Sequence, residues 1–346
     1  MDTRTEPAGE ITAGTPAPRP RRRRWPRVLL AVLAAGLLAL LAGAGWLYHR
    51  TEQALSSIDR IPDALPTLPE ARQPARAPEA ADAQLYLLVG LDARTTPTTA
   101  ESPDGVPGWQ AGAARSDTMM LLQIAADRKT ASLVSLPRDT WTEIPGHGEA
   151  KLNAAYSWGG PALMVETVQN LTGLRIDHLA VIDWTGFRAL TDAVGGVTVD
   201  GTRLDGTAAL EYVRERTSLP EGDLDRTRRQ QNFLRALLSQ TLSAGTLTDP
   251  GRLTGLLDTI GEVISVDDRL SNGDLRDLAW ELRAVRAADI AFMNAPVSGT
   301  AMVAGQSVVL LDEEAAAPLW QAMREDTMAD FLASDAAPAT LGDTVR

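Results

Sequence analysis

The stretch Leu85-Tyr86-Leu87-Leu88-Val89, which ends at Gly90, is the part of the sequence that decides the fold class. Five consecutive apolar residues closed by a glycine are typical of a buried strand. The end of a central strand in an α/β domain is a common position for ligand-binding residues. Gly90-Leu91-Asp92-Ala93-Arg94 follows at this end, so the candidate site begins where the first strand stops.

Further strand-like and helical patterns follow this strand in mixed order. Two apolar runs, 119–124 and 131–136, flank Asp127-Arg128-Lys129 and predict a hairpin. The other strand-like runs span 176–182, 197–199, 290–295 and 307–311, and the helical patterns span 161–171, 187–193, 205–216, 224–243, 253–264, 274–285 and 313–328. Because strands and helices are intermixed without a strict βαβ repeat, we expect an α/β fold with a mixed central sheet flanked by helices on both faces.

An uncharged run near the N-terminus, residues 28–48, predicts one transmembrane helix that precedes this domain. At about 1.5 Å per residue, roughly 20 helical residues reach about 30 Å, the thickness of the hydrocarbon core. Six arginines lie between Arg19 and Arg27, and such a basic block keeps the preceding residues in the cytoplasm. We therefore expect a single-pass protein of the cell membrane, with a cytoplasmic N-terminus and an extracytoplasmic C-terminal domain.

The alternative for this run is a cleavable signal peptide, because Ala42-Gly43-Ala44 resembles a small-x-small cleavage site. The length of the run and the 27 residues ahead of it favour an uncleaved anchor. Both interpretations place the same domain outside the cytoplasm. The organisation that we expect is a disordered basic tail over 1–27, the span over 28–48, a proline-rich linker over 49–83, the folded domain over 84–332 and a flexible tail over 333–346.

The composition argues against several classes of function. The formal net charge is −12, which disfavours nucleic acid as a general partner because non-specific binding needs a broad positive surface. The chain has no cysteine and only three histidines, so thiolate chemistry, disulfides and histidine-rich metal sites have no basis. It also lacks Walker A, Gly-x-Ser-x-Gly and His-Glu-x-x-His patterns, which leaves nucleotide hydrolysis, serine hydrolysis and zinc proteolysis without support.

Two acidic residues near strand ends are candidate metal ligands. Asp92 follows the first strand, and Asp117 lies in Arg115-Ser116-Asp117-Thr118 at the entrance to the next. Two converging carboxylates suit Mg²⁺, which takes oxygen ligands together with substrate phosphate. Taken singly, Asp92 is better explained as a cap within a turn, and the Arg115–Asp117 pair as a solvated ion pair.

A third cluster, Ser135-Leu136-Pro137-Arg138-Asp139-Thr140, follows another strand, and Lys151-Leu152-Asn153-Ala154-Ala155-Tyr156 comes soon after it. The structural alternative is a proline turn that carries a surface Arg–Asp pair. Lys151 stands out because it is one of only two lysines among 33 basic residues. In a chain that otherwise uses arginine, a retained lysine hints that a compact ammonium group is required at this position.

The fourth cluster is rich in arginine and spans residues 211–216 and 222–231. On the predicted helix, Arg226, Arg229 and Gln230 share one face because they are three and four residues apart. Guanidinium groups bind phosphate oxygens in a two-pronged manner, so several converging arginines suit a pyrophosphate. Acidic residues are interleaved with the arginines, and composition alone allows an ion-paired surface equally well.

In this order and behind an N-terminal anchor, the motifs resemble the LytR-CpsA-Psr family of cell-envelope phosphotransferases. The series consists of Gly-Leu-Asp-Ala-Arg at 90–94, Arg-Ser-Asp-Thr at 115–118, Leu-Pro-Arg-Asp at 136–139, Lys-Leu-Asn-Ala-Ala-Tyr at 151–156, Asp-Ala-Val-Gly-Gly-Val at 192–197, Tyr-Val-Arg-Glu-Arg at 212–216 and Asp-Leu-Asp-Arg-Thr-Arg-Arg-Gln-Gln at 223–231. The resemblance covers roughly residues 85–238. It implies an enzyme that moves a glycopolymer from a polyprenyl-pyrophosphate carrier onto a sugar hydroxyl of peptidoglycan, forming a phosphodiester.

The resemblance also implies a role for each matching residue. Asp92 and Asp117 would hold Mg²⁺ at the pyrophosphate, and Asp92 and Arg138 would be the catalytic residues. The pyrophosphate oxygens would be bound by Arg94, Arg115, Arg138, Lys151, Arg214, Arg216, Arg226 and Gln230. The lipid tail would lie in an apolar groove, for which the helical segments 161–171 and 187–193 are candidates. The long loop between Arg94 and Arg115 departs from the family's compact pattern and leaves open how Asp92 approaches Asp117.

Two other functions would use the same residues. A pyrophosphate hydrolase would use water in place of the sugar hydroxyl, and a regulatory module would bind the polyprenyl pyrophosphate without transfer. The short N-terminal tail holds no folded domain, which argues against intracellular signalling. The expected partners are the polyprenyl-pyrophosphate-linked glycopolymer, peptidoglycan and the membrane, with no nucleic acid. The polymer and the acceptor sugar stay open.

Overall fold

The computed structural model describes residues 42–43, 45–93, 114–215, 223–241, 245, 249–282, 285–338 and 340 of the chain. The chain divides into two units, 1–49 and 50–346, and the second carries the sheet. The described residues of the first unit are helical. Most of the predicted span 28–48 lies outside the described residues, and none of the helices within them combines the length and the apolar content of a membrane span.

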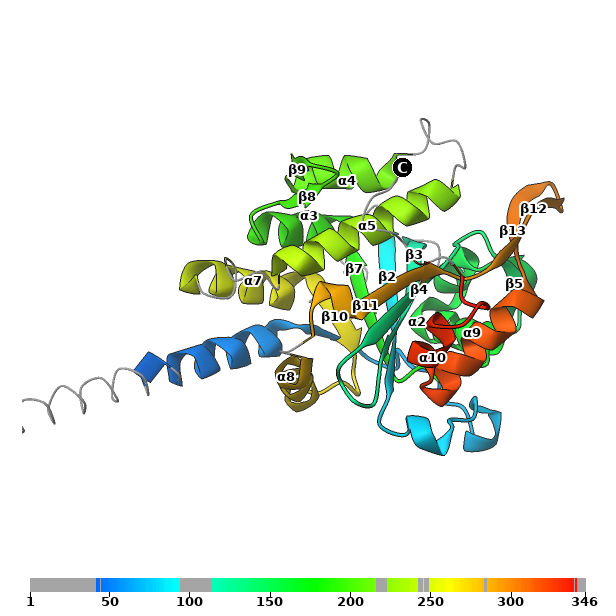
Figure 1. Cartoon of the computed structure of the whole chain (residues 1–346), viewed down its shortest axis with the longest axis horizontal. Coiled ribbons are helices and arrows are strands. Elements are labelled where there is room, and N and C mark those ends of the chain that lie inside the picture. Colours follow the sequence, from blue (N-terminus) through cyan, green and yellow to red (C-terminus); the bar gives the residue numbers. More distant parts are fainter. Residues whose placement is uncertain are drawn as a thin grey trace, which may run out of the picture. The chain divides into compact units, whose positions relative to one another are not determined.

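A seven-stranded mixed sheet forms the centre of the second unit (Figure 1). Its order across the sheet is β1 (Asp59–Ile61), β10 (Ile264–Asp267), β7 (His178–Asp183), β2 (Gln84–Ala93), β3 (Ala114–Ile124), β4 (Ala131–Leu136) and β11 (Ile290–Asn294). The pairs β1–β10, β7–β2 and β4–β11 are parallel, and the other neighbours are antiparallel. The segment that opened the sequence analysis is therefore the central strand, and the predicted mixed sheet is confirmed.

One face of the sheet is covered by α2 (Asn153–Thr172), α9 (Glu313–Glu325) and α10 (Met328–Leu332). Their apolar side chains and the inward residues of the sheet form the largest buried cluster of the unit. The backbone of α2 kinks at Gly159 and Gly160, so Pro161 begins a second helical segment where its missing N–H does no harm. The helix ends at Gly173, whose φ of 66° is the left-handed conformation that glycine adopts readily.

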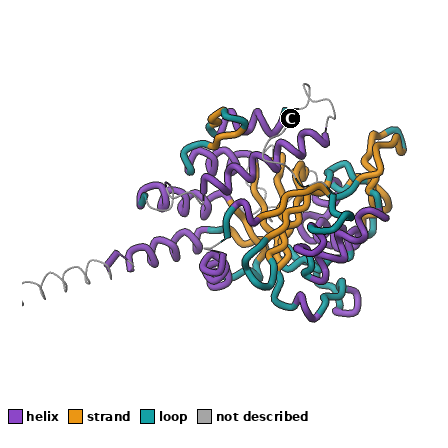
Figure 2. The backbone as a smooth tube through the Cα atoms, in the orientation of Figure 1, coloured by secondary structure: helices purple, strands orange, loops and turns teal. Residues whose placement is uncertain are grey.

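Together with the helical residues 50–57, other described helices cover the opposite face (Figure 2). They are α3 (Trp184–Ala193), α4 (Gly206–Arg214), α5 (Asp223–Thr241), α7 (Pro250–Val263) and α8 (Asn272–Glu281). Leu234 and Leu238 of α5 pack on the sheet, whereas Phe233 and Leu237 pack against α3 and α4. Asp205 caps the start of α4, because its carboxylate accepts a hydrogen bond from the backbone N–H of Ala208.

Within the described residues, the unit also contains three two-stranded hairpins, three single-turn helices and the helical residues 50–57. The hairpins are β5 (Trp141–Ile144) with β6 (Gly148–Lys151), β8 (Val197–Val199) with β9 (Thr202–Leu204), and β12 (Val297–Val303) with β13 (Gln306–Leu311). The 3₁₀ turns are η1 (Glu70–Arg72), η2 (Pro78–Ala80) and η4 (Ala287–Asp289).

The structure corrects the expected linker over 49–83. Residues 59–61 form the edge strand β1, and Ile61, Ala64 and Leu65 are buried in the main core. The folded unit therefore begins well before residue 84. The proline-rich composition that suggested a linker instead reflects short turns between these buried contacts.

Candidate functional site

A polar cavity of about 800 Å³ lies at the end of β2 and β3. It is lined by Asp92, Arg115, Asp117, Arg138, Trp184, Val213, Arg214, Arg226 and Gln230. Four arginines face two aspartates in this cavity, within a chain whose formal charge is −12. The local excess of positive charge suits an anion with several oxygens, such as a pyrophosphate.

A β-bulge between β2 and β3 explains how consecutive residues reach this cavity. Thr118 pairs with Gly90 and Ser116 pairs with Leu91, which leaves Asp117 as the extra residue. In a regular strand Asp117 and Thr118 would point to opposite faces. With the bulge, Asp117 lines the polar cavity and Thr118 lines the adjoining apolar one, while Ser116 is fully buried.

Glycine suits the position beside this bulge. A Cβ atom on Gly90 would lie 3.1 Å from the Cβ of Thr118, so a larger residue would require Thr118 to move by a few tenths of an ångström. The motif Gly-Leu-Asp thus places a small residue where β2 lies close to Thr118 of β3, and it places Asp92 two positions later. Asp92 pairs directly with Arg115 across the two strands.

Ion pairs hold Arg138 at the wall of the cavity. Its guanidinium contacts the carboxylate of Asp117, and its Nε lies 3.8 Å from Asp139 Oδ2. Lys151 Nζ lies 3.1 Å from the other oxygen of Asp139. The side chains of Arg138 and Asp117 are 17% and 12% exposed, so both keep one side open to a ligand.

Helices α4 and α5 supply the opposite wall. Arg214 ends α4 and lies over the indole of Trp184, 5.5 Å from the ring centroid. Arg226 and Gln230 are one turn apart on α5, and Arg226 is only 3% exposed. Gln230 Oε1 accepts a hydrogen bond of 3.1 Å from Thr118, which ties α5 to the bulge.

Arg229 does not line the cavity with Arg226 and Gln230, although the helical spacing predicted that these three residues share one face of α5. Its guanidinium lies 5.0 Å from the centroid of the Tyr212 ring, on α4. Burial is the main cause that raises the pKa of Tyr212, so this phenol stays neutral beneath the arginine. Arg229 thus links α4 to α5 rather than lining the cavity.

An apolar cavity of about 960 Å³ adjoins the polar one, and the two share Trp184, Val213 and Gln230. Its walls come from β2, β3, β7, α3 and α5, with apolar side chains that include Leu88, Met120, Phe187, Leu190, Phe233, Leu234 and Leu237. Phe187 and Leu190 of the expected groove segment 187–193 line this cavity. The predicted contribution of 161–171 is wrong, because Met164, Val165 and Val168 of α2 pack in the main core on the other face of the sheet.

The structure brings together seven of the residues that the sequence proposed: Asp92, Arg115, Asp117, Arg138, Arg214, Arg226 and Gln230. Arg94 and Arg216 lie outside the described residues. Lys151 is not among the residues described as lining the cavity and pairs with Asp139 behind Arg138. It is therefore placed to position Arg138 rather than to face the cavity.

Trp184, Val213 and Thr118 are site residues that the sequence analysis missed. Trp184 is the first residue of α3, directly after the N-cap Asp183, whose carboxylate accepts from the N–H of Gly186. A signal was present, because a tryptophan immediately after a buried strand lies at the same sheet end as Asp92. Val213 could not be separated from a core residue by its type.

The two carboxylates fit a divalent cation that also binds substrate oxygens. Asp92 and Asp117 line one cavity, and Mg²⁺ sites commonly combine one or two carboxylates with phosphate and water. Among the described residues no group of three or more His, Cys, Asp and Glu side chains could hold a metal. A cation bound by Asp92 and Asp117 would take its remaining oxygen ligands from water or from the substrate.

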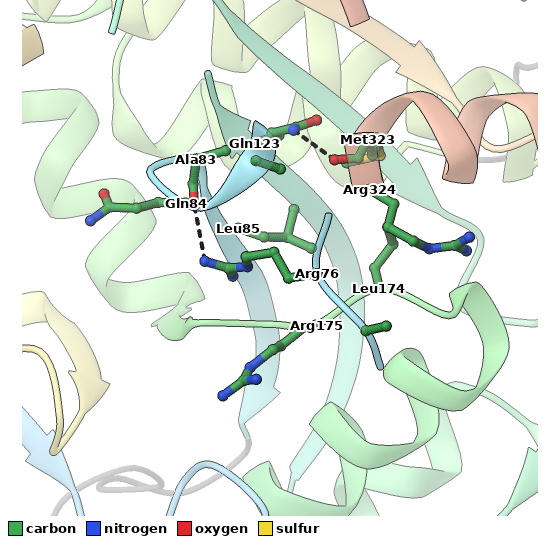
Figure 3. A pocket seen from close by; sticks show the side chains of 11 residues that line it. Arg76, Ala83, Gln84, Leu85, Gln123, Leu174, Arg175, Met323 and Arg324 are labelled. Atoms are coloured by element: carbon green, nitrogen blue, oxygen red, sulfur yellow. Dashed lines mark hydrogen bonds between the residues drawn. The ribbon is translucent and has the colours of Figure 1, made fainter. Parts of the chain in front are cut away.

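A second polar pocket lies at the opposite end of β2, near Leu85 (Figure 3). Seven residues separate Leu85 from Asp92, which corresponds to about 24 Å along the strand. Its arginines are already engaged: Arg76 pairs with Asp177, Arg175 pairs with Glu70, and Arg324 donates to the carbonyl of Gly173. At about 320 Å³ it is also smaller than the polar cavity, so it is the weaker candidate for a pyrophosphate.

Comparison with known proteins agrees with this geometry. The sequence profile of the LytR_cpsA_psr family matches residues 66–203 and 201–325. The probable cell wall biosynthesis protein LcpB of Corynebacterium glutamicum is 33% identical over 86% of this chain and 70% of its own length. The polyisoprenyl-teichoic acid–peptidoglycan teichoic acid transferase TagU of Oceanobacillus iheyensis is 32% identical over 71% of this chain and 78% of its own length.

Solved structures share the fold. A structure of TagT bound to LI-WTA superposes with a TM-score of 0.53 at 25% identity, over 74% of this chain and 93% of that one. The family profile covers most of the chain and includes every described residue of the polar cavity. This protein is a member of the LytR_cpsA_psr family.

Proposed function

We propose that this protein transfers a glycopolymer from a polyprenyl-pyrophosphate carrier to a sugar hydroxyl of peptidoglycan, forming a phosphodiester. The observation that carries the proposal is the pairing of two cavities of opposite character that share Trp184, Val213 and Gln230. A ligand with an anionic head and a long apolar tail matches both cavities at once. The family and the printed names of its relatives support a transferase of the cell wall.

In this proposal the arginines bind the pyrophosphate and stabilise the charge that moves to its leaving oxygen. Arg115, Arg138 and Arg214 reach it from β3, the loop after β4 and α4. The sugar hydroxyl attacks the phosphorus that carries the glycopolymer, the bond to the bridging oxygen breaks, and polyprenyl phosphate leaves. Phosphoryl transfer depends mainly on such positioning and charge stabilisation.

Asp92 is the proposed acceptor of the hydroxyl proton. It lines the same cavity as Arg138 and pairs across the strands with Arg115, which leaves its carboxylate facing the ligand. Asp92→Asn should abolish transfer and keep a large part of the lipid binding. Equal loss of transfer and of binding would argue against the base role. Binding is measured with a non-reactive polyprenyl-pyrophosphate analogue.

Mg²⁺ is the proposed cofactor, held by Asp92 and Asp117 together with oxygens of the pyrophosphate. When bound, it would neutralise charge on the phosphate oxygens. Asp117 also contacts Arg138, so the same carboxylate positions a guanidinium whether or not a cation is present. Titration with EDTA and then Mg²⁺ or Ca²⁺ tests the dependence.

The N-terminal run 28–48 is proposed to anchor the protein in the cell membrane, with the basic tail in the cytoplasm and the folded unit outside. Such a tether would keep the polar cavity near a donor that is itself confined to the membrane and would raise the effective concentration of both partners. Labelling of single engineered cysteines before and after this run, with a membrane-impermeant reagent on intact cells, tests the orientation.

The full-length protein in lipid nanodiscs is incubated with a short polyprenyl-pyrophosphate oligosaccharide, a peptidoglycan fragment and Mg²⁺. Mass spectrometry should detect the glycan joined to the fragment through a phosphodiester. Arg138→Ala should lower the rate by about 100- to 1000-fold, the usual effect of removing one preorganised charge-stabilising donor. Arg252→Ala is the matched control, because Arg252 is a half-exposed arginine on α7, outside both cavities.

Two other products would overturn the proposal. Free glycan phosphate without a joined fragment would assign the protein to the hydrolases. A bound and unchanged lipid, in the presence of acceptor and Mg²⁺, would assign it to the binding modules.

A further inference from the structure

The outer face of the β5–β6 hairpin carries aromatic and acidic side chains that the transfer chemistry leaves unused. Register pairs Trp141 with Lys151 and Glu143 with Glu149. The alternate residues Ile144 and Ala150 pack into the main core, so these two pairs point outward. At the turn, the exposed ring of His147 lies against Trp158, with 5.1 Å between ring centroids.

This strip is connected to the polar cavity through Asp139, although none of its residues is among the described residues that line the cavity. Lys151 binds Asp139, and Asp139 neighbours Arg138 in the cavity wall. From Trp141 the hairpin extends three residues to Ile144, which is about 10 Å at the rise of a strand. Trp158 lies five residues after the start of α2, about 7.5 Å along that helix. The strip is therefore long enough for more than one unit of a polymer.

Structural roles do not account for these side chains. Trp158 is 43% exposed, although burial would stabilise so large an apolar ring. Glu143 and Glu149 lie directly opposite one another, and like charges in such a pair destabilise a hairpin. Within the part of the chain that the structure describes, neither carboxylate forms an ion pair.

Their combination matches the chemistry of a sugar chain. The C–H groups on one face of a pyranose ring pack on the electron-rich face of an indole. The carboxylates accept hydrogen bonds from sugar hydroxyl groups at the edges of the ring. An apolar peptide would gain nothing from the paired glutamates, and an anionic polymer would be repelled by them.

We infer that the strip formed by Trp141, Glu143, His147, Glu149, Lys151 and Trp158 binds the glycan backbone of the acceptor and directs one of its hydroxyl groups toward Arg138. This inference rests on the proposed function for the identity of the acceptor. The binding itself requires neither the lipid donor nor Mg²⁺. The inferred acceptor subsite lies on the β5–β6 hairpin, next to Arg138.

The test measures binding of a soluble, uncharged oligomer of N-acetylated amino sugars, which stands in for the peptidoglycan backbone, to the full-length protein in nanodiscs without donor. Trp158→Ala should weaken this binding at least tenfold. Trp280→Ala is the matched control, because Trp280 is a 67% exposed tryptophan on α8, and it should bind as the wild type does. Glu149→Gln, which keeps the size of the side chain, should weaken binding several-fold and covers the case in which Trp158→Ala fails to fold.

Transfer kinetics distinguish this inference from the proposed function. Trp158→Ala should raise KM for the acceptor and leave donor affinity unchanged, whereas Arg138→Ala should lose transfer and keep glycan binding. Equal glycan binding by Trp158→Ala, Glu149→Gln and the wild type would overturn the inference while transfer stands. Glycan binding that depends on Trp158 in a protein that never forms the phosphodiester would support the inference and remove the proposed function.

Discussion

The two faces of the central sheet differ in how completely they are filled. Toward α2 and α9, alternate residues of β2 enter a closed core: Leu85, Leu87, Val89 and Leu91. Toward α3 and α5, the residues between them line two cavities: Leu88, Gly90 and Asp92. One strand thus supplies stability with one set of side chains and a binding surface with the other, because successive residues point to opposite faces.

This difference separates the residues that hold the fold from those that form the site. The face toward α2 and α9 is filled with well-packed side chains, and removal of any of them leaves a void. The face toward α3 and α5 already contains an apolar cavity that is partly open to solvent, and its lining side chains lack packing partners on the open side. Substitutions at adjacent residues of β2 should therefore differ in their effect on the stability of the fold.

The largest effect on stability should come from Leu87→Ala. Leu87 is completely buried, and its truncation should lower the free energy of unfolding by about 2–5 kcal/mol. Leu88→Ala removes the same atoms from the next residue but enlarges a cavity that is already open, so it should cost less than half as much. Urea denaturation of both variants measures this, and equal losses would contradict the division between the two faces.

A second test fills the open face. Ala180 of β7 lines the apolar cavity, and Ala180→Phe would place a ring where the lipid tail is proposed to lie. The affinity for a long-chain polyprenyl pyrophosphate should fall about tenfold, a loss of about 1.4 kcal/mol. The affinity for a head-group analogue with a short chain should not change, and the melting temperature should not fall.

Competition binding with the two analogues separates these effects. If Ala180→Phe weakens both ligands equally, the cavity is not the tail site and the variant has instead disturbed the arginines.

A smaller effect is expected from Thr118→Val at the bulge. The change keeps the shape of the side chain and removes its hydrogen bond to Gln230. Transfer should fall roughly two- to tenfold, as expected for a hydrogen bond worth about 0.5–1.5 kcal/mol. Thr118→Ser keeps the hydroxyl and should retain most of the activity. A kcat/KM for Thr118→Val equal to that of the wild type would show that the bond does not position α5.

The smallest effect should appear far from the cavities, at the start of α8. Ser271 and Asp274 form a capping box, and the side-chain and backbone donors of Ser271 lower the pKa of the Asp274 carboxyl. A lowered pKa in the folded state stabilises the protein above the ordinary pKa near 3.8, and this contribution is lost as the pH falls through the lowered value. Ser271→Ala should cost about 1 kcal/mol at pH 7.

The difference between Ser271→Ala and the wild type should narrow on acidification, because a protonated Asp274 accepts weakly from Ser271. The free energies of unfolding of both proteins at pH 7 and pH 3 measure this difference. If the difference is the same at both pH values, the capping box does not depend on the charge of Asp274. Transfer activity should be unaffected at neutral pH, since α8 contributes to neither cavity.

Local sequence patterns predicted the elements whose causes are local. The hairpin of β3 and β4 was predicted from the turn residues that separate two apolar runs. The grouping of Asp92, Asp117 and Arg138 in one site was expected from the family resemblance, and all three line the polar cavity.

Features that depend on distant pairing were not predictable. The bulge at Asp117 exists only in the register between β2 and β3, which no short window of sequence records. The three residues of β1 are too few to show a strand period and become a strand by pairing with β10. Lys151 was assigned to the pyrophosphate from the family resemblance, whereas in the structure it pairs with Asp139.

The pairing of β1 with β10 also bears on the order in which the chain folds. Asp59 meets Ser265, some two hundred residues later, so the first strand to be synthesised has no partner until most of the domain has emerged. Ion pairs from Arg50 to Asp258 and from Glu52 to Arg276 join residues that are similarly far apart in the sequence. Contacts this distant slow folding, because a long loop must close before any of them forms. The edge of the sheet nearest the N-terminus is thus expected to be the last part to assemble, and it remains open to wrong strand partners until then.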